Sequence, residues 1–215
     1  MINCAIFDLD GTILNTLGDL HAAVNHAMRT FDKPEHSLDE VRRMVGNGVA
    51  KLISRALPKD SQDLSAAALI CFKEYYESHI CVHTRPYEGI EQMLKTLKER
   101  GIKCAVLTNK HDGAARMLAD KFFAGMFDIV HGGRAEVALK PAPEGLLLLC
   151  SELGSSPENC VMTGDSAVDI LTGKAAGTHT AGVSWGFRSR DELRLAGAEY
   201  IADTAKNLTE FLLSL

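Results

Sequence analysis

Short apolar segments that end in polar turn residues recur along this chain, and from Gly89 onward they alternate with helical patterns. Such segments are typical of strands buried on both faces of a parallel sheet. The predicted strands cover residues 3–7, 102–107, 128–130, 160–162, 179–183 and 200–201. The predicted helices cover residues 89–100, 114–123, 143–153, 167–176 and 205–213. This alternation predicts an α/β fold with a doubly wound, mainly parallel sheet.

One region interrupts the alternation. Between the first predicted strand and Gly89 lie roughly 70 residues without a convincing strand pattern. Helical patterns cover residues 17–31, 38–57 and 64–79, and prolines separate them. We therefore expect an α/β core made of residues 1–13 and 84–215, with a small all-helical domain of residues 14–83 inserted after the first strand.

Composition narrows the classes of partner and compartment. The 215 residues carry a net charge of -5 without a block of like charges, which argues against a nucleic-acid partner. The six cysteines include no C-x-x-C pair, so neither a zinc site nor a disulfide framework is indicated. No apolar run approaches the ~20 residues that cross a membrane. We expect a cytoplasmic protein, monomeric or homodimeric, that acts on a small molecule.

Carboxylates follow two of the predicted strands. Asp8 and Asp10 come after the first strand, and Asp165 and Asp169 come after the strand at 160–162. Because ligands of open α/β sheets bind beyond the carboxyl ends of the strands, we expect these acids to converge at one edge. Thr108, Asn109 and Lys110 follow the second strand, and Lys140 precedes the helix at 143, so the same edge gains a hydroxyl, an amide and lysine side chains.

This set of groups suits metal-assisted phosphoryl transfer. Oxygen ligands favour Mg²⁺, with Asp8 and Asp165 as side-chain ligands. A phosphoryl group beside that ion could be attacked by Asp8, giving an aspartyl-phosphate. Asp10 could protonate the leaving oxygen and later activate water.

The remaining groups fit the phosphoryl oxygens. Gly11 lets the chain turn sharply beneath the phosphate, and Thr108 and Lys140 can bind its oxygens. Each position also has a plainer interpretation. Thr108 could be a helix N-cap, and Asp169 could be a first-turn acid favoured by the helix dipole.

Four short motifs occur together in this order: Asp8-Leu9-Asp10-Gly11-Thr12, Thr108, Lys140-Pro141 and Gly164-Asp165-Ser166-x-x-Asp169. Together they resemble the four motifs of the haloacid dehalogenase superfamily and span nearly the whole chain. The helical insertion resembles the cap of that superfamily's first subclass. Val45-Gly46-Asn47-Gly48-Val49, Thr108-Asn109-Lys110 and Lys140-Pro141-Ala142-Pro143 resemble its phosphoglycolate phosphatase group.

The resemblance implies an Mg²⁺-dependent phosphatase that acts on a small phosphomonoester, with phosphoglycolate as the expected substrate. It implies Asp8 as nucleophile and Asp10 as acid/base. The metal would take the Asp8 carboxylate, the Asp10 backbone oxygen and Asp165, with Asp169 close behind them. Gly11, Thr108, Asn109 and Lys140 would bind the phosphate.

In the insertion, Arg43 and Asn47 are candidates for the distal end of the substrate, although Gly46-Asn47-Gly48 also fits an ordinary turn. Two positions depart from many relatives. Asn15 stands where an Asp is common, and Arg134 stands where an acidic residue is common.

Alternatives within the superfamily differ in how far the residues exclude them. Asp10 argues against a dehalogenase or a phosphonate hydrolase, whereas a sugar-phosphate mutase and a pyrophosphatase stay open. A receiver-like phospho-acceptor module is the non-enzyme alternative. It fits poorly, since such modules have no helical insertion and carry their acceptor Asp after the third strand.

Overall fold

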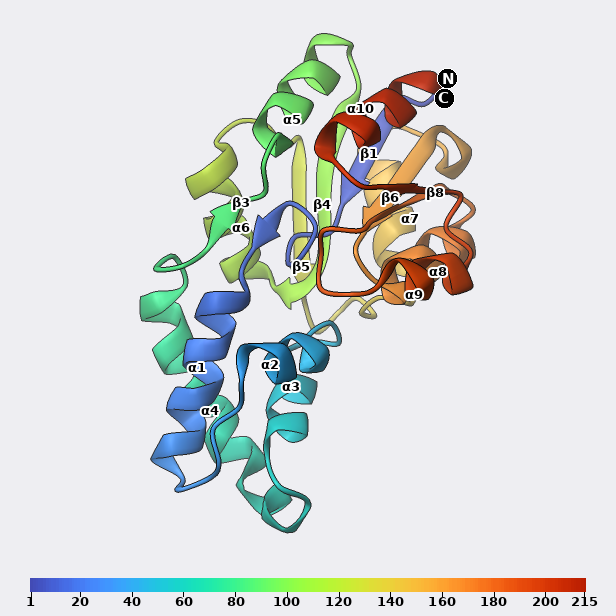
Figure 1. The fold of residues 1–215 in the computed structure, drawn as a ribbon. Coiled ribbons are helices and arrows are strands. Elements are labelled where there is room, and N and C mark those ends of the chain that lie inside the picture. The colour runs from blue at the N-terminus through green and yellow to red at the C-terminus, as the bar shows by residue number, and fades with distance from the viewer. The chain divides into compact units, whose positions relative to one another are not determined.

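The protein contains a six-stranded sheet (Figure 1), in a computed structural model that describes residues 1–215. Its strands are β1 Cys4–Phe7, β4 Lys103–His111, β5 Ile129–Gly133, β6 Cys160–Gly164, β7 His179–Val183 and β8 Tyr200–Ala202. The order across the sheet is β5-β4-β1-β6-β7-β8, and each pair of neighbours is parallel. The predicted doubly wound α/β fold is confirmed.

The order of the strands places one switch point at the centre of the sheet. After β1 the next strand of the sheet is β4 on one side, whereas after β6 it is β7 on the other. β1 and β6 are neighbours, with Phe7 paired in register with Thr163. Chains that leave adjacent strands in opposite directions open a crevice at the carboxyl ends of those strands. The residues that directly follow β1 and β6 therefore lie where such sheets bind ligands.

Ten α-helices accompany the strands. They are α1 Leu17–Thr30, α2 Leu38–Met44, α3 Val49–Ala56, α4 Ser65–His79, α5 Ile90–Glu99, α6 Asp112–Phe123, α7 Glu144–Glu152, α8 Ala167–Ala176, α9 Arg190–Ala196 and α10 Ala205–Ser214. Short 3-10 helices cover Lys59–Leu64 and Pro157–Asn159. None of the helices combines the length and the apolar character needed to span a membrane.

Several predicted boundaries are wrong. The single helix predicted for residues 38–57 is two helices, because Gly46 and Gly48 adopt φ values of 124° and 81° that end α2 before α3 begins. Helix α9 and the paired two-residue strands β2 (Leu14–Asn15) and β3 (Arg85–Pro86) were not predicted, since such short elements show no periodicity.

Two strands are also longer than expected. β4 continues to His111, so Thr108 lies inside the strand, and the N-cap of α6 is His111. The interpretation of Thr108 as a helix N-cap is therefore wrong. β5 extends to Gly133, beyond the predicted end at residue 130.

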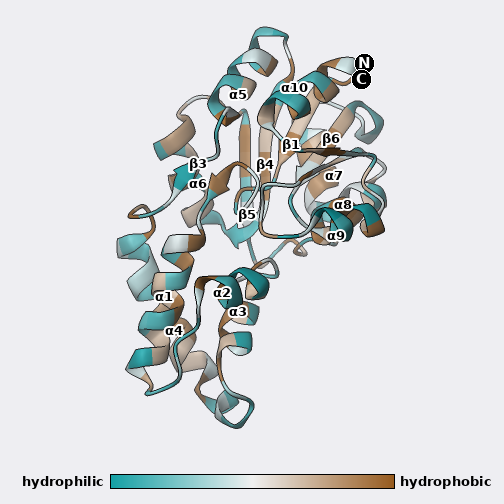
Figure 2. Ribbon diagram, viewed as in Figure 1, coloured by the Kyte–Doolittle hydropathy of each residue, from teal (hydrophilic) through white to brown (hydrophobic).

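The sheet is buried on both faces. One face packs Ile6, Ala105 and Met162 against Leu146 and Leu149 of α7, and all five are at most 2% exposed. On strand β1 the alternate residue Phe7 contacts the ring of Phe127, which in turn contacts Phe123 of α6. Figure 2 shows the central strands as hydrophobic, while the helices carry hydrophilic segments as well. Burial on both faces explains why these strands read as continuous apolar runs.

Residue contacts divide the chain into two compact units. The first unit contains Met1–Leu14 and Pro86–Leu215, with the six-stranded sheet. The second contains Asn15–Arg85, with helices α1 to α4. The sequence placed the two junctions at residues 13/14 and 83/84, and the contacts place them at 14/15 and 85/86.

The two ends of the second unit are joined by one buried carboxylate. Asp19 of α1 is 1% exposed, and its oxygens accept hydrogen bonds from the backbone N–H of His83 (2.7 Å) and of Thr84 (2.9 Å). The Thr84 hydroxyl donates a third bond of 2.7 Å. A buried carboxylate with three donors is fully compensated, so Asp19 ties the start of α1 to the segment that leaves the unit.

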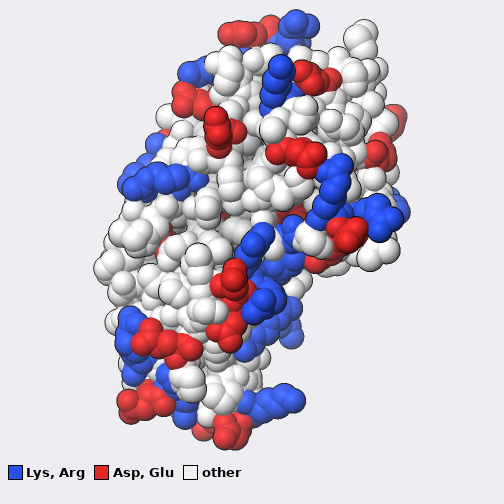
Figure 3. Space-filling model, viewed as in Figure 1, with Lys and Arg blue, Asp and Glu red and all other residues white.

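Charged side chains of both signs are mixed over the surface. Figure 3 shows acidic groups beside most of the basic ones on the visible face. Exposed ion pairs such as Arg29–Glu35 and Lys95–Glu91 are examples. Exposed pairs of this kind contribute little to stability, roughly 0–1 kcal/mol each.

Candidate active site

Asp8 directly follows β1, at the carboxyl end of the paired strands β1 and β6. Its backbone N–H donates to the carbonyl oxygen of Thr163, 2.9 Å away, which continues the pairing of the two strands by one residue. The chain then turns, with Leu14 N–H donating to Leu9 O at 3.0 Å. Gly11 in this turn has φ 84°, and a Cβ there would lie 2.4 Å from Oδ2 of Asp165. Only glycine lets this turn approach Asp165 so closely.

Three carboxylates gather at this point. Asp8, Asp165 and Asp169 can each offer an oxygen such that all three oxygens lie within 4.8 Å of one another. Burial raises the pKa of Asp8 to about 6, although Lys140 acts in the opposite direction. Burial and the charges of Asp169 and Asp8 raise the pKa of Asp165 well above its usual range. The cluster is thus rich in negative charge that the side chains only partly compensate.

Lys140 is the buried cation of this cluster. Its Nζ lies 3.0 Å from Asp8 Oδ1 and 2.6 Å from Asp169 Oδ1, and its side chain is 3% exposed. Burial acts to lower the pKa of Lys140, but Asp169 and Asp8 outweigh it and raise that pKa above its usual value. The ammonium group therefore stays charged between two of the three carboxylates.

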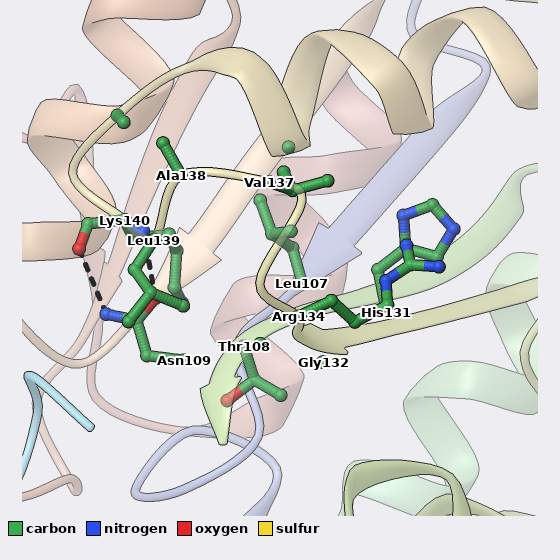
Figure 4. A pocket seen from close by; sticks show the side chains of 13 residues that line it. Leu107, Thr108, Asn109, His131, Gly132, Arg134, Val137, Ala138, Leu139 and Lys140 are labelled. Carbon is green, nitrogen blue, oxygen red and sulfur yellow. Dashed lines mark hydrogen bonds between the residues drawn. The ribbon is translucent and has the colours of Figure 1, made fainter. Parts of the chain in front are cut away.

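Asn109 fixes the backbone of Lys140. Its Nδ2 donates to Lys140 O at 3.0 Å, and its Oδ1 accepts from Lys140 N–H at 2.8 Å, as the dashed lines in Figure 4 show. Both polar groups of the Asn109 side chain thus bond to the backbone of Lys140. The phosphate-binding role of Asn109 stays a prediction, and its side chain positions Lys140.

Asp169 has two sets of partners. Its Oδ1 accepts from Lys140, while its Oδ2 accepts from the backbone N–H (3.1 Å) and the hydroxyl (2.7 Å) of Ser166. Asp169 is therefore both the first-turn acid of α8 and a member of the acidic cluster. Gly164 makes room for it, because a Cβ there would lie 2.1 Å from Cγ of Asp169.

Asp10 lies apart from this pairing and has its own lysine. Lys110 Nζ is 3.1 Å from Asp10 Oδ1 and 3.2 Å from Oδ2, and the Lys110 side chain is 4% exposed. The sequence placed Lys110 after the second predicted strand, but it did not predict this pairing with Asp10. The partnership joins residues 100 positions apart, so no local pattern could predict it.

The loop after β7 donates a hydrogen bond to Asp165, and this bond was not predicted from the sequence. The backbone N–H of Phe187 donates to Asp165 Oδ2 at 2.6 Å. Trp185 Nε1 donates to the carbonyl oxygen of Thr12 at 3.0 Å, which ties the same loop to the turn after β1. A backbone donor has no sequence signature. The one available signal in this loop was Trp185, the only tryptophan of the chain.

Thr108 lines a hollow beside Lys140. Figure 4 shows this hollow between the end of β4 and the segment that leads to Lys140, with Leu107, Val137 and Leu139 at its wall. The Thr108 side chain is buried, and its Oγ1 accepts from Lys110 N–H at 3.3 Å. Its predicted role toward phosphate stays a prediction.

Arg43 and Asn47 belong to the second unit, and their contact with substrate stays a prediction. Within that unit Asn47 Oδ1 accepts from Arg55 Nη2 at 2.7 Å, and Arg55 Nη1 donates to Met44 O at 2.6 Å. Arg55 therefore braces the turn between α2 and α3, a role that the sequence did not reveal.

The two departures from relatives also have visible contacts. Asn15 Oδ1 accepts from Leu17 N–H at 3.3 Å, at the first turn of α1. Arg134 Nε lies 3.9 Å from Asp112 Oδ1.

The acidic cluster fits a divalent cation. Three carboxylates share one buried ammonium group, so positive charge is missing where their oxygens converge. The donor atoms are oxygens, which Mg²⁺ prefers over softer ligands. Asp8, Asp165 and Asp169 are the side chains that could hold such an ion.

A doubly wound sheet with this cluster at its switch point is an arrangement that suits a cation and an anionic ligand. The sequence profile of the haloacid dehalogenase-like hydrolases matches residues 5–183, and the chain belongs to this family. The predicted family and the prediction of an enzyme are confirmed.

Within the family the chain is a phosphoglycolate phosphatase-like hydrolase. It is 32% identical over 215 residues to the phosphoglycolate phosphatase of Haemophilus influenzae, covering 96% of each chain. It is 36% identical over 190 residues to that of Mannheimia succiniciproducens, covering 84% of this chain and 85% of the relative. A candidate phosphoglycolate phosphatase of Lactobacillus delbrueckii subsp. bulgaricus has a similar crystal structure, with a TM-score of 0.91, 32% identity and 98% coverage of both chains.

Proposed function

We propose that this protein is a Mg²⁺-dependent phosphomonoester hydrolase that acts through an aspartyl-phosphate on Asp8, with 2-phosphoglycolate as its substrate. The proposal depends above all on the separation of two carboxylates. Asp8 belongs to the acidic cluster with Lys140, whereas Asp10, two residues later, is paired only with Lys110 among the lysines. Two carboxylates in different surroundings can take the roles of nucleophile and acid/base.

Each residue then has a defined role in the reaction. Asp8 attacks phosphorus, and the bond from phosphorus to the ester oxygen breaks as the Asp8–phosphorus bond forms. Asp10 gives its proton to the leaving oxygen, and afterwards takes a proton from the water that hydrolyses the aspartyl-phosphate. Lys140 donates to the phosphoryl oxygens and stabilises their charge. When bound, Mg²⁺ supplies positive charge that reduces repulsion between the carboxylate and the phosphoryl group.

The substrate proposal rests on the relatives named as phosphoglycolate phosphatases, two of which match 96% and 84% of this chain. A small phosphorylated metabolite also suits Arg43 and Asn47 as contacts for a second anionic group. A pyrophosphatase or a sugar-phosphate mutase would use the same Asp8 and Asp10, so the choice between them requires an assay.

The test is phosphate release from 2-phosphoglycolate, pyrophosphate, a hexose 1-phosphate and p-nitrophenyl phosphate, each with Mg²⁺ and with EDTA. We expect release from 2-phosphoglycolate at the highest kcat/KM, and none in EDTA. Asp8→Asn should abolish turnover while the circular dichroism spectrum is unchanged. No release from any of the four substrates would refute the phosphatase function, and conversion of the hexose 1-phosphate to its 6-phosphate would identify a mutase.

A further inference from the structure

Lys110 is a buried lysine whose ammonium group contacts a carboxylate of the site. It lies near the end of β4, its side chain is 4% exposed, and its Nζ lies 3.1 and 3.2 Å from the two carboxylate oxygens of Asp10. An ammonium group taken out of water is unfavourable unless a partner compensates it. A position this costly at an active site calls for a functional explanation.

The geometry of the pair constrains the Asp10 carboxylate. Because Nζ is almost equidistant from the two oxygens, the carboxylate cannot turn or swing away without losing a charge-assisted hydrogen bond. The lysine itself is anchored, since its backbone N–H donates to Oγ1 of Thr108 at 3.3 Å. The position of Asp10 is therefore set by β4 as well as by its own turn.

The two buried lysines of the site pair with different acids. Lys140 pairs with Asp8 and Asp169, whereas Lys110 pairs with Asp10. Asp10 is thus held by a cation other than the one beside the nucleophile. An acid/base group must stay within about 2.6–3.2 Å of the oxygen that gains or loses the proton. A displacement of about 1 Å can lower a rate about 100-fold.

We propose that Lys110 is a positioning residue that holds the Asp10 carboxylate toward the leaving-group oxygen. This inference rests on the proposed function, because it requires Asp10 to exchange a proton with the substrate. It adds to that function a residue that acts on turnover through Asp10. Removal of Lys110 then slows the proton-transfer steps and leaves substrate binding largely intact.

A double-mutant cycle of Lys110→Met and Asp10→Asn tests this coupling, with kcat and KM measured separately on 2-phosphoglycolate, or on p-nitrophenyl phosphate if the wild type prefers it. We expect Lys110→Met to lower kcat about 10- to 100-fold and to change KM by less than about threefold. Asp10→Asn should lower kcat about 10²- to 10⁴-fold. In the Asp10→Asn background, Lys110→Met should lower kcat no further, because no acid/base remains to be positioned.

Two further variants serve as controls. Lys110→Arg keeps the charge and the donors and should recover part of kcat. Lys103→Met removes a lysine from the opposite end of β4, where Nζ donates to Leu153 O at 2.6 Å, and should leave kcat unchanged. If Lys110→Met is unfolded by circular dichroism, Lys110→Gln replaces it in the cycle.

The outcomes separate this proposal from the proposed function. Equal losses of kcat on Lys110→Met in the wild-type and Asp10→Asn backgrounds would overturn the positioning role and leave the phosphatase intact. An unchanged kcat in Lys110→Met would do the same. A wild type without phosphatase activity would overturn both.

Discussion

Lys140 should be essential for the stability of the metal-free protein as well as for its chemistry. Replacing it by Met removes the only ammonium group beside Asp8 and Asp169, at 3.0 and 2.6 Å. Removing one partner of a buried ion pair costs about 3–5 kcal/mol, because the remaining charge is left uncompensated. For a chain of about 200 residues each kcal/mol shifts Tm by roughly 2–4 °C. The expected fall in Tm is therefore roughly 6–20 °C.

The sign of the effect can be checked by removing a negative charge as well. In Lys140→Met the three carboxylates repel one another without a cation, so adding Asp169→Asn should restore part of the lost stability. Asn keeps an oxygen that can accept from Ser166, as Asp169 does now. The assay is thermal unfolding in EDTA, followed by circular dichroism, for the wild type, both single variants and the double variant.

Two results would refute this reasoning. One is a Lys140→Met protein with the same Tm as the wild type, which would mean that its charge does not compensate the cluster. The other is a double variant that is no more stable than Lys140→Met. In that case lost packing, and not uncompensated charge, would explain the fall.

Three other predictions concern the metal, a glycine and a helix cap. Because the pKa of Asp8 is raised to about 6 from 3.8, the metal-free native state binds a proton that the unfolded state has lost, and this contribution to stability disappears as pH rises through 6. The difference in Tm between Mg²⁺ and EDTA should therefore be larger at pH 7.5 than at pH 5.5, and an equal difference at both would contradict it. Gly164→Ala places a Cβ 2.1 Å from Cγ of Asp169 and should lower kcat on p-nitrophenyl phosphate. The control Gly177→Ala meets no atom within 4 Å and should leave kcat unchanged. It should lower Tm somewhat, because alanine is strained at the φ of 76° that Gly177 adopts. Ser37→Ala removes the capping box of α2 with Glu40 and should cost about 1 kcal/mol in urea unfolding without changing kcat on p-nitrophenyl phosphate.

Much of the fold could be predicted because its strands are buried on both faces. Such strands, like β1 and β6, appear in the sequence as apolar runs that end where the acids begin, so Asp8 and Asp165 could be placed at one edge. The break in the helix predicted at 38–57 could also have been predicted from the sequence, because Gly46 and Gly48 lie within it. Its cause is a positive φ, which periodicity alone does not detect.

The remaining features depend on contacts between distant segments. The pairing of Lys110 with Asp10 arises only when β4 lies beside β1, and the bond from Phe187 N–H to Asp165 involves a backbone group that every residue but proline has. The sequence therefore identified which residues carry charge at the site. It could not identify which charge compensates which.

The Asp19 carboxylate has a consequence for how such a chain can change during evolution. The second unit is a segment of 71 residues, from Asn15 to Arg85. If it were a flexible loop, its closure entropy would destabilise the folded sheet. Because Asp19 joins the start of this segment to His83 and Thr84 near its end, the closure is made by bonds inside the insert. For the folding of the sheet, the insert then costs about as much closure entropy as a short loop. We expect that residues 15–85 could be exchanged for the equivalent segment of a relative without loss of the sheet's own folding.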